Sequence, residues 1–128
     1  MKTIYGRAAL TAVSSLKSNA GPEPESAWLE AVASETKSEE SRKKCCPKGA
    51  FLGLCGAQLL KMVTTSACVP NENGGYAVAA VKLLRRDRRL ANDKAALWGQ
   101  IPGAPVHQNG QMDVVLALWN NGDIKGSR

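Results

Sequence analysis

Apolar residues recur at intervals of three and four along most of the chain, which is the spacing of one buried helix face. The first such run follows Thr3 and is predicted to continue to about Asn19, where Ala20-Gly21-Pro22 ends it. A second helix is predicted to open at Glu23-Pro24-Glu25, because acidic residues are favoured in a first turn.

The middle of the chain alternates polar connections with helical patterns. Residues 34–46 are polar, and we expect an exposed or mobile linker there. Thr36 followed by Glu39 fits a capping box, so a short exposed helix is the alternative. The next helix is predicted from Pro47, which is well tolerated at a first helical position, to about Met62. Residues 64–74 are predicted to form a loop.

The C-terminal half repeats this organisation. A fourth main helix is predicted over residues 75–86 or 75–89, and a shorter one follows a cap at Asn92 or Asp93. Two prolines indicate a loop over residues 101–110. The last helix is predicted over residues 111–120, and its apolar positions extend beyond one face, which indicates a central place in the fold.

Composition agrees with a helical protein. Alanine and leucine supply most of the apolar content and only 5% of residues are aromatic, a balance that favours helices over sheets. No repeat and no convincing alternating strand is present in the sequence. The 128 residues suit one domain. We therefore expect an all-α fold, a single compact domain of five to seven helices spanning residues 1–128.

Charge and hydropathy narrow the function only slightly. No signal peptide and no apolar run of membrane-spanning length is visible, so we expect a cytoplasmic protein with reduced cysteines and no membrane partner. The net charge of +6 is compatible with an acidic partner such as nucleic acid, but it does not require one. The sequence indicates no cofactor. Its partner is open, with a homodimer and a second protein among the alternatives.

Two segments carry a family resemblance. They are KCCPKGAFLGLC at residues 44–55 and QMDVVLALW at residues 111–119. Within residues 44–122 the chain resembles a group of small uncharacterised bacterial proteins, some of them carried on mobile integron gene cassettes. The resemblance implies a helical fold and a bacterial, horizontally transferred origin. It implies no activity and no catalytic residues.

Cys46 is a candidate nucleophile. It precedes Pro47 near a predicted helix start, where exposed backbone amides and neighbouring lysines would lower the pKa of its thiol. His107, the single histidine, could act as its base with Asn109 or Asp113 orienting the ring. The alternative is a structural thiol. No metal site is expected, because the cysteines lack the paired spacing of zinc ligands: Cys45, Cys46, Cys55 and Cys68.

Three glycines share one side of the helix predicted after Pro47. Gly49, Gly53 and Gly56 fall within an arc of about 60° at 100° per residue. Glycine weakens a helix by up to about 1 kcal/mol relative to alanine, so this groove needs a reason. Close approach of another helix is one explanation, and a ligand resting on the exposed backbone is the other.

Basic residues line one face of the helix predicted after Gly75. This basic stripe consists of Lys82, Arg85, Arg86 and Arg89. Such a row could follow a phosphate backbone, with an affinity that falls as salt rises. An ordinary solvated face and an acidic protein partner are the alternatives, since no aromatic residues interleave with the stripe.

The segment before the last helix is dense in polar groups. Asn109 could cap that helix. Asn109 and Asp113 could instead border a polar pocket at a helix N-terminus. Trp119 is expected to be a core anchor, and a binding cleft that it lines with Trp98 is the alternative. The function that we expect is a binding or interaction module for a protein partner, a second copy or a small ligand. A thiol enzyme using Cys46 and His107 is one alternative, and a nucleic-acid-binding accessory protein is another.

Overall fold

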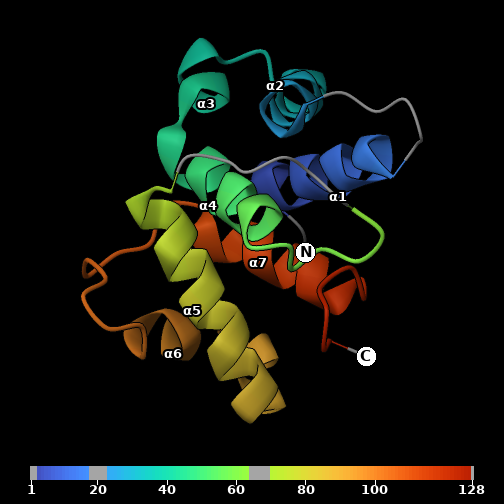
Figure 1. The fold of residues 1–128 in the computed structure, drawn as a ribbon. Coiled ribbons are helices and arrows are strands. Elements are labelled where there is room, and N and C mark those ends of the chain that lie inside the picture. The colour runs from blue at the N-terminus through green and yellow to red at the C-terminus, as the bar shows by residue number, and fades with distance from the viewer. Residues whose placement is uncertain (1–2, 18–22, 64–69, 128) are drawn as a thin grey trace.

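A computed structural model describes residues 3–17, 23–63 and 70–127. The described residues form seven α-helices and one 3₁₀ helix, and they contain no strand (Figure 1). In chain order these are α1 (Ile4–Leu16), α2 (Pro24–Glu35), α3 (Glu39–Lys43), α4 (Cys45–Gly56), α5 (Glu72–Arg86), η1 (Arg88–Asn92), α6 (Lys94–Gly99) and α7 (Gln111–Asn120). The predicted all-α fold is confirmed.

Short polar side chains start most of these helices. Thr3 caps α1 by accepting a hydrogen bond from the Gly6 amide, and Asp93 caps α6 in the same way. Ser38 caps α3 through the Ser41 amide, so the short-helix alternative describes this segment correctly. The predicted capping box at Thr36 is wrong, because Thr36 ends α2 rather than starting α3.

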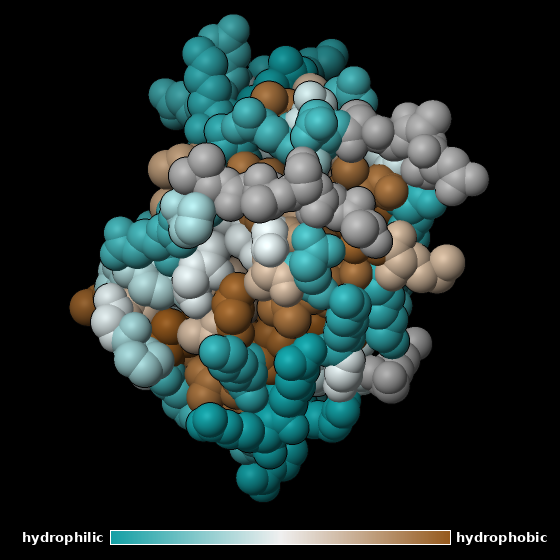
Figure 2. All heavy atoms as spheres, viewed as in Figure 1, coloured by the Kyte–Doolittle hydropathy of each residue, from teal (hydrophilic) through white to brown (hydrophobic). Residues whose placement is uncertain are grey.

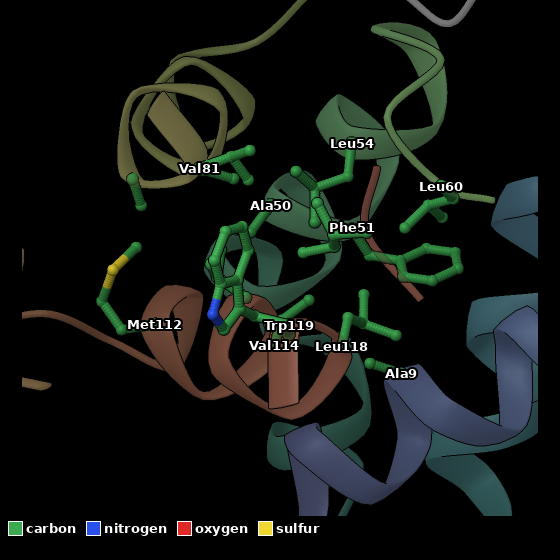
Figure 3. Packing of buried hydrophobic residues seen from close by; sticks show 14 of the residues in the cluster. Ala9, Ala50, Phe51, Leu54, Leu60, Val81, Met112, Val114, Leu118 and Trp119 are labelled. Carbon is green, nitrogen blue, oxygen red and sulfur yellow. The ribbon is translucent and has the colours of Figure 1, made fainter. Parts of the chain in front are cut away.

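Helix α7 lies at the centre of the fold, between α1, α4 and α5 (Figure 1). Its apolar side chains face all three of these helices, and Figure 3 shows Leu118 near Phe51 of α4 and Ala9 of α1. Seven of its ten residues are buried. Across the core, the rings of Trp28 and Phe51 lie 5.4 Å apart and join α2 to α4. The central position predicted for the last helix is confirmed.

The C-terminal segment after α7 returns to the core. Leu60 and Ile124 form an antiparallel bridge and are both fully buried. Beside them, the Lys17 ammonium lies 2.7 Å from the carboxylate of Asp123, whose side chain is only 8% exposed. These contacts attach the end of the chain to the ends of α1 and α4.

Helix α4 differs from its prediction at both ends. It starts at Cys45 rather than Pro47, and it ends at Gly56 instead of continuing to Met62. The helix stops because Gln58, the residue after the C-cap Ala57, takes a left-handed backbone conformation with a φ of 58°. Met62 also has a left-handed backbone, with a φ of 59°. Met62, predicted on the apolar side of α4, is 85% exposed as a consequence.

Other predicted boundaries can be compared only in part. Helix α5 begins three residues before Gly75, with Asn71 as its cap. Helix α1 ends at Leu16, and the predicted end at Asn19 with its stop at Ala20-Gly21-Pro22 falls largely outside the described residues. Most of the predicted loop at residues 64–74, including Cys68, also lies outside them. The loop predicted at residues 101–110 contains no helix.

Candidate functional site: a groove between α4 and α5

Helices α4 and α5 touch through their backbones. A Cβ atom placed on Gly53 would lie 2.2 Å from the Cα atom of Gly74, a separation that no real side chain shows. Any residue other than glycine would therefore hold the two helices apart. Close approach of another helix explains Gly53, as the first of the two sequence interpretations proposed.

Asn71 secures the same contact at the start of α5. Its side-chain oxygen accepts a hydrogen bond from the Gly74 amide at 2.7 Å, and its Nδ2 donates to the carbonyl oxygen of Gly49 at 3.2 Å. A Cβ atom on Gly49 would lie 2.6 Å from that asparagine oxygen. Gly49 thus gives room to the cap of α5, and it does not line the groove described next.

Beside this contact, residues of both helices line a groove of about 440 Å³. Its lining is mostly small or apolar: Leu52, Gly53, Gly56, Ala57, Pro70, Asn71, Gly74, Gly75, Val78, Ala79 and Lys82. Figure 2 shows hydrophobic residues reaching the surface beside α5, near the end of α4. We call this space the α4–α5 groove. Two of the three predicted glycines, Gly53 and Gly56, border it.

Lys82 and Gly75 give the groove its two most useful features. Lys82 is exposed and is the only charged residue among those that line it. Gly75 is exposed, and a Cβ atom there would meet nothing within 4 Å. A side chain could therefore be added at Gly75 without a clash with the described residues. Sequence reasoning assigned Lys82 to the basic stripe and missed its place beside an apolar groove.

The structure places Cys46 differently from its prediction. It is the second residue of α4, follows exposed Cys45 and is half-buried. Burial raises the pKa of the Cys46 thiol, the charge and hydrogen bond of Cys45 raise it further, and Lys44 only partly opposes them. The predicted lowering of this pKa is therefore wrong. The N-cap position belongs to Lys44, and burial outweighs the lysine charge.

His107 lies in the exposed loop before α7. It borders a shallow pocket of about 330 Å³ together with Lys94, Trp98 and Gln108. Among the described residues that line this pocket, Cys46 is not included. The pairing of Cys46 with His107 as nucleophile and base stays a hypothesis, and the raised pKa of Cys46 does not favour it.

The residues predicted as ligand contacts near the start of α7 make other contacts within the chain. Asn109 does not cap this helix: Gly110 occupies the N-cap position with a φ of 93°, and the Gln108 side chain accepts from the Gly110 and Met112 amides. Asp113 pairs with Lys94 at 2.8 Å. Trp119 is 5% exposed and lies beneath the Arg88 guanidinium.

The basic stripe is partly used within the chain. Arg85 donates to the Lys125 carbonyl oxygen at 3.1 Å, and Arg89 pairs with Asp87 at 3.0 Å. The hydrogen bond from Arg89 lowers the pKa of the Asp87 carboxyl. Arg86 is exposed. Two of its four side chains already bind oxygen atoms of the protein itself. The basic stripe is therefore less suited to binding the phosphate backbone of a nucleic acid than its sequence suggested.

A family model matches residues 1–125, almost the whole chain. The chain belongs to the family of unknown function DUF6979. No curated protein and no solved structure matches it. Membership of DUF6979 carries no activity, so the function of this chain has to be argued from its own geometry.

Two further findings bear on what this DUF6979 chain can do. Among residues 3–17, 23–63 and 70–127, no three potential metal-ligating side chains come together. No helix in the described part of the chain has the length and apolar character needed to cross a membrane. The α4–α5 groove, with its apolar lining and one exposed cation at its border, has the shape to hold another molecule.

Proposed function

We propose that this protein is a binding module whose α4–α5 groove holds a small amphipathic acid. The observation that carries the proposal is an apolar groove bordered by a single exposed cation. Its volume of about 440 Å³ falls in the range of about 300–1,000 Å³ that is typical of small-ligand sites. Of the functions that the sequence allows, small-ligand binding fits this shape best.

The walls of the groove favour an apolar ligand body. Leu52, Val78 and Ala79 supply aliphatic surface, and the glycines let a ligand approach the helix backbones closely. Burial of apolar ligand surface contributes roughly 25 cal/mol per Å² before the costs of association. An aliphatic or aromatic body can therefore bind here without specific polar contacts.

Lys82 favours an acidic head group. An exposed ammonium attracts a carboxylate, and an ion pair of this kind contributes up to about 1 kcal/mol. That contribution corresponds to a roughly fivefold change in affinity. The acid should consequently bind more tightly than an alcohol or an amine of the same chain length.

The proposal is tested with decanoate, decan-1-ol and decylamine as probes, measured by isothermal titration calorimetry. We expect decanoate to bind most tightly, and Lys82→Gln to weaken decanoate roughly fivefold while leaving decanol unchanged. Equal binding of all three probes, or no binding of decanoate at millimolar concentration, would contradict the proposal.

A second variant locates the binding site. Gly75→Leu should fill the groove and abolish decanoate binding without loss of folding, because its added side chain starts in open space. Gly99→Leu is the matched control, since Gly99 also has no atom within 4 Å of an added Cβ and lies away from the groove in α6. Decanoate binding that survives Gly75→Leu would place the ligand elsewhere.

Other properties of the chain remain proposals on separate grounds. A cytoplasmic location rests on the sequence showing no signal peptide and no membrane-spanning apolar run, and a bacterial, integron-borne origin rests on the resemblance of residues 44–122 to such proteins. Self-association is a further possibility for a binding module. Native mass spectrometry with and without decanoate would report both the oligomeric state and the bound ligand.

A further inference from the structure

The basic stripe continues one wall of the α4–α5 groove along α5. Gly75 and Lys82 border the groove, and Arg86 lies four residues beyond Lys82 in the last turn of the helix. These three residues fall within an arc of about 40° at 100° per residue, so they share one side of α5. Figure 2 shows hydrophilic residues at the end of α5, next to the hydrophobic surface. Arg86 therefore follows Lys82 on the side of α5 that lines the groove.

Lys82 and Arg86 are the members of the basic stripe whose charges are not used within the described residues. Both are exposed, and the ion pairs of the described chain involve neither of them. The other two members are engaged, since Arg85 donates to a backbone carbonyl oxygen of the C-terminal segment and Arg89 pairs with a carboxylate. The stripe thus offers two cations, four residues apart, to a ligand. Two cations suit a single anionic group better than a long row of phosphates.

We propose that the acid bound in the groove is a phosphate monoester of a single-chain alcohol, with its phosphate group between Lys82 and Arg86. This inference rests on the proposed function, because the groove must hold the chain. Residues four apart are neighbours on a helix surface, and a step of four residues advances about 6 Å along the axis. One phosphate oxygen can then meet the Lys82 ammonium while two others meet the Arg86 guanidinium, since arginine binds phosphate in a bidentate manner.

Charge favours a phosphate over a carboxylate at this pair of cations. A phosphate monoester carries a charge of about −1.5 to −2 at pH 7 and three acceptor oxygens, whereas a carboxylate carries one charge and two oxygens. A carboxylate is therefore neutralised by Lys82 alone, and the phosphate needs Arg86 as well. An additional exposed ion pair increases affinity by up to roughly fivefold. The phosphate should consequently bind more tightly than a carboxylate of the same chain length.

The test compares decyl phosphate with decanoate by isothermal titration calorimetry, each below the concentration at which it forms micelles. The wild type should bind decyl phosphate roughly fivefold more tightly than decanoate. Arg86→Gln should remove this preference and leave the decanoate affinity unchanged, and Arg86→Lys should retain part of it. Arg89→Gln is the matched control, because it removes the same charge from an arginine that pairs with Asp87, and it should keep the full preference.

The possible failures can be told apart. Equal wild-type affinities for the two ligands, or an unchanged preference in Arg86→Gln, would overturn the phosphate inference and leave the proposed acid-binding groove in place. Failure of both ligands to bind would overturn the proposed function as well. Vesicles that contain phosphatidic acid present the same phosphate monoester on a membrane. Binding to these vesicles without binding of decyl phosphate in solution would assign the two cations to a lipid surface and overturn the inference. Circular dichroism checks that each variant is folded.

Discussion

Gly53 of α4 and Gly74 of α5 meet backbone to backbone. A Cβ atom on Gly53 would lie 2.2 Å from the Gly74 Cα atom, and one on Gly74 would lie 2.8 Å from the Gly53 Cα atom. Neither backbone can give way as a flexible side chain could. This contact fixes the distance between the two helices, and with it the width of the groove that we propose as a binding site.

The first prediction concerns Gly53→Ala. Alanine is the better helix former by up to about 1 kcal/mol, yet here its methyl group would push two backbones apart. We expect a net destabilisation of roughly 1–3 kcal/mol, the usual cost of overpacking a well-packed contact. Urea unfolding followed by circular dichroism measures it as a lower midpoint. A midpoint equal to or above the wild type would show that α4 and α5 do not touch at Gly53.

Gly75→Ala, at the residue next to Gly74, should have the opposite effect on stability. Gly75 lies within α5, and its added Cβ would meet nothing within 4 Å, so only helix propensity changes. We expect stabilisation by about 0.5–1 kcal/mol, observed as a higher urea midpoint. The sign reversal between two glycines of one site is the diagnostic result. Destabilisation by Gly75→Ala would mean that the space beside Gly75 is not open.

Local signals predicted much of the fold. Helix α7 has the predicted bounds, because a glycine precedes it, Asn121-Gly122 follows it and residues 114–119 are an uninterrupted apolar run. Helix α5 was predicted three residues short because Gly74-Gly75 resembles loop punctuation. Only the packing against α4 explains glycine inside this helix, and packing between distant segments leaves no local signal.

The candidate site was less accessible to sequence reasoning. The glycine spacing in α4 indicated a close approach or a ligand. The structure shows the close approach at Gly53, and Gly56 borders the groove in which we propose a ligand. The apolar groove beside Lys82 could not be predicted from the sequence, since it depends on how α4 packs against α5. Burial of Cys46 likewise depends on tertiary packing, which reversed the expected direction of its pKa.

A third prediction concerns Arg88, which sequence reasoning left out of the basic stripe. Its guanidinium donates to the carbonyl oxygens of Gly126 and Ser127 at 2.7 and 2.8 Å and lies 5.4 Å from the Trp119 ring centre. Arg88→Ala should loosen the C-terminal segment by about 1 kcal/mol, since hydrogen bonds from a charged donor are partly screened at an exposed site. Hydrogen exchange over residues 123–127 should accelerate several-fold.

Arg86→Ala is the control for that measurement. Arg86 is exposed at the end of α5, two residues before Arg88, and carries the same charge, so it reports any general effect of removing a basic residue. We expect its exchange rates over residues 123–127 to match the wild type. Equal acceleration in both variants would assign the effect to net charge instead of to the contacts of Arg88.

The last prediction follows from the raised pKa of the Cys46 thiol. Iodoacetamide reacts with the thiolate, so Cys46 in the folded protein should reach its half-maximal alkylation rate at a higher pH than in the urea-unfolded chain. The raised pKa of Cys46 also affects the stability of the protein. Because the thiol holds its proton more tightly in the folded state, it stabilises the fold at pH values below the pKa that it has in the unfolded chain. That stabilisation is lost as pH rises through the folded value.

Peptide mapping by mass spectrometry resolves the rate for Cys46 against pH, with a Cys45→Ser variant separating the two neighbours. Removing Cys45 should shift the Cys46 profile back toward lower pH, since the charge and hydrogen bond of Cys45 contribute to the raised pKa. Burial, the larger cause, should keep the profile above that of the unfolded chain. Alkylation of Cys46 that is half-maximal at lower pH than in the unfolded chain would instead revive Cys46 as an activated nucleophile and favour the thiol-enzyme alternative.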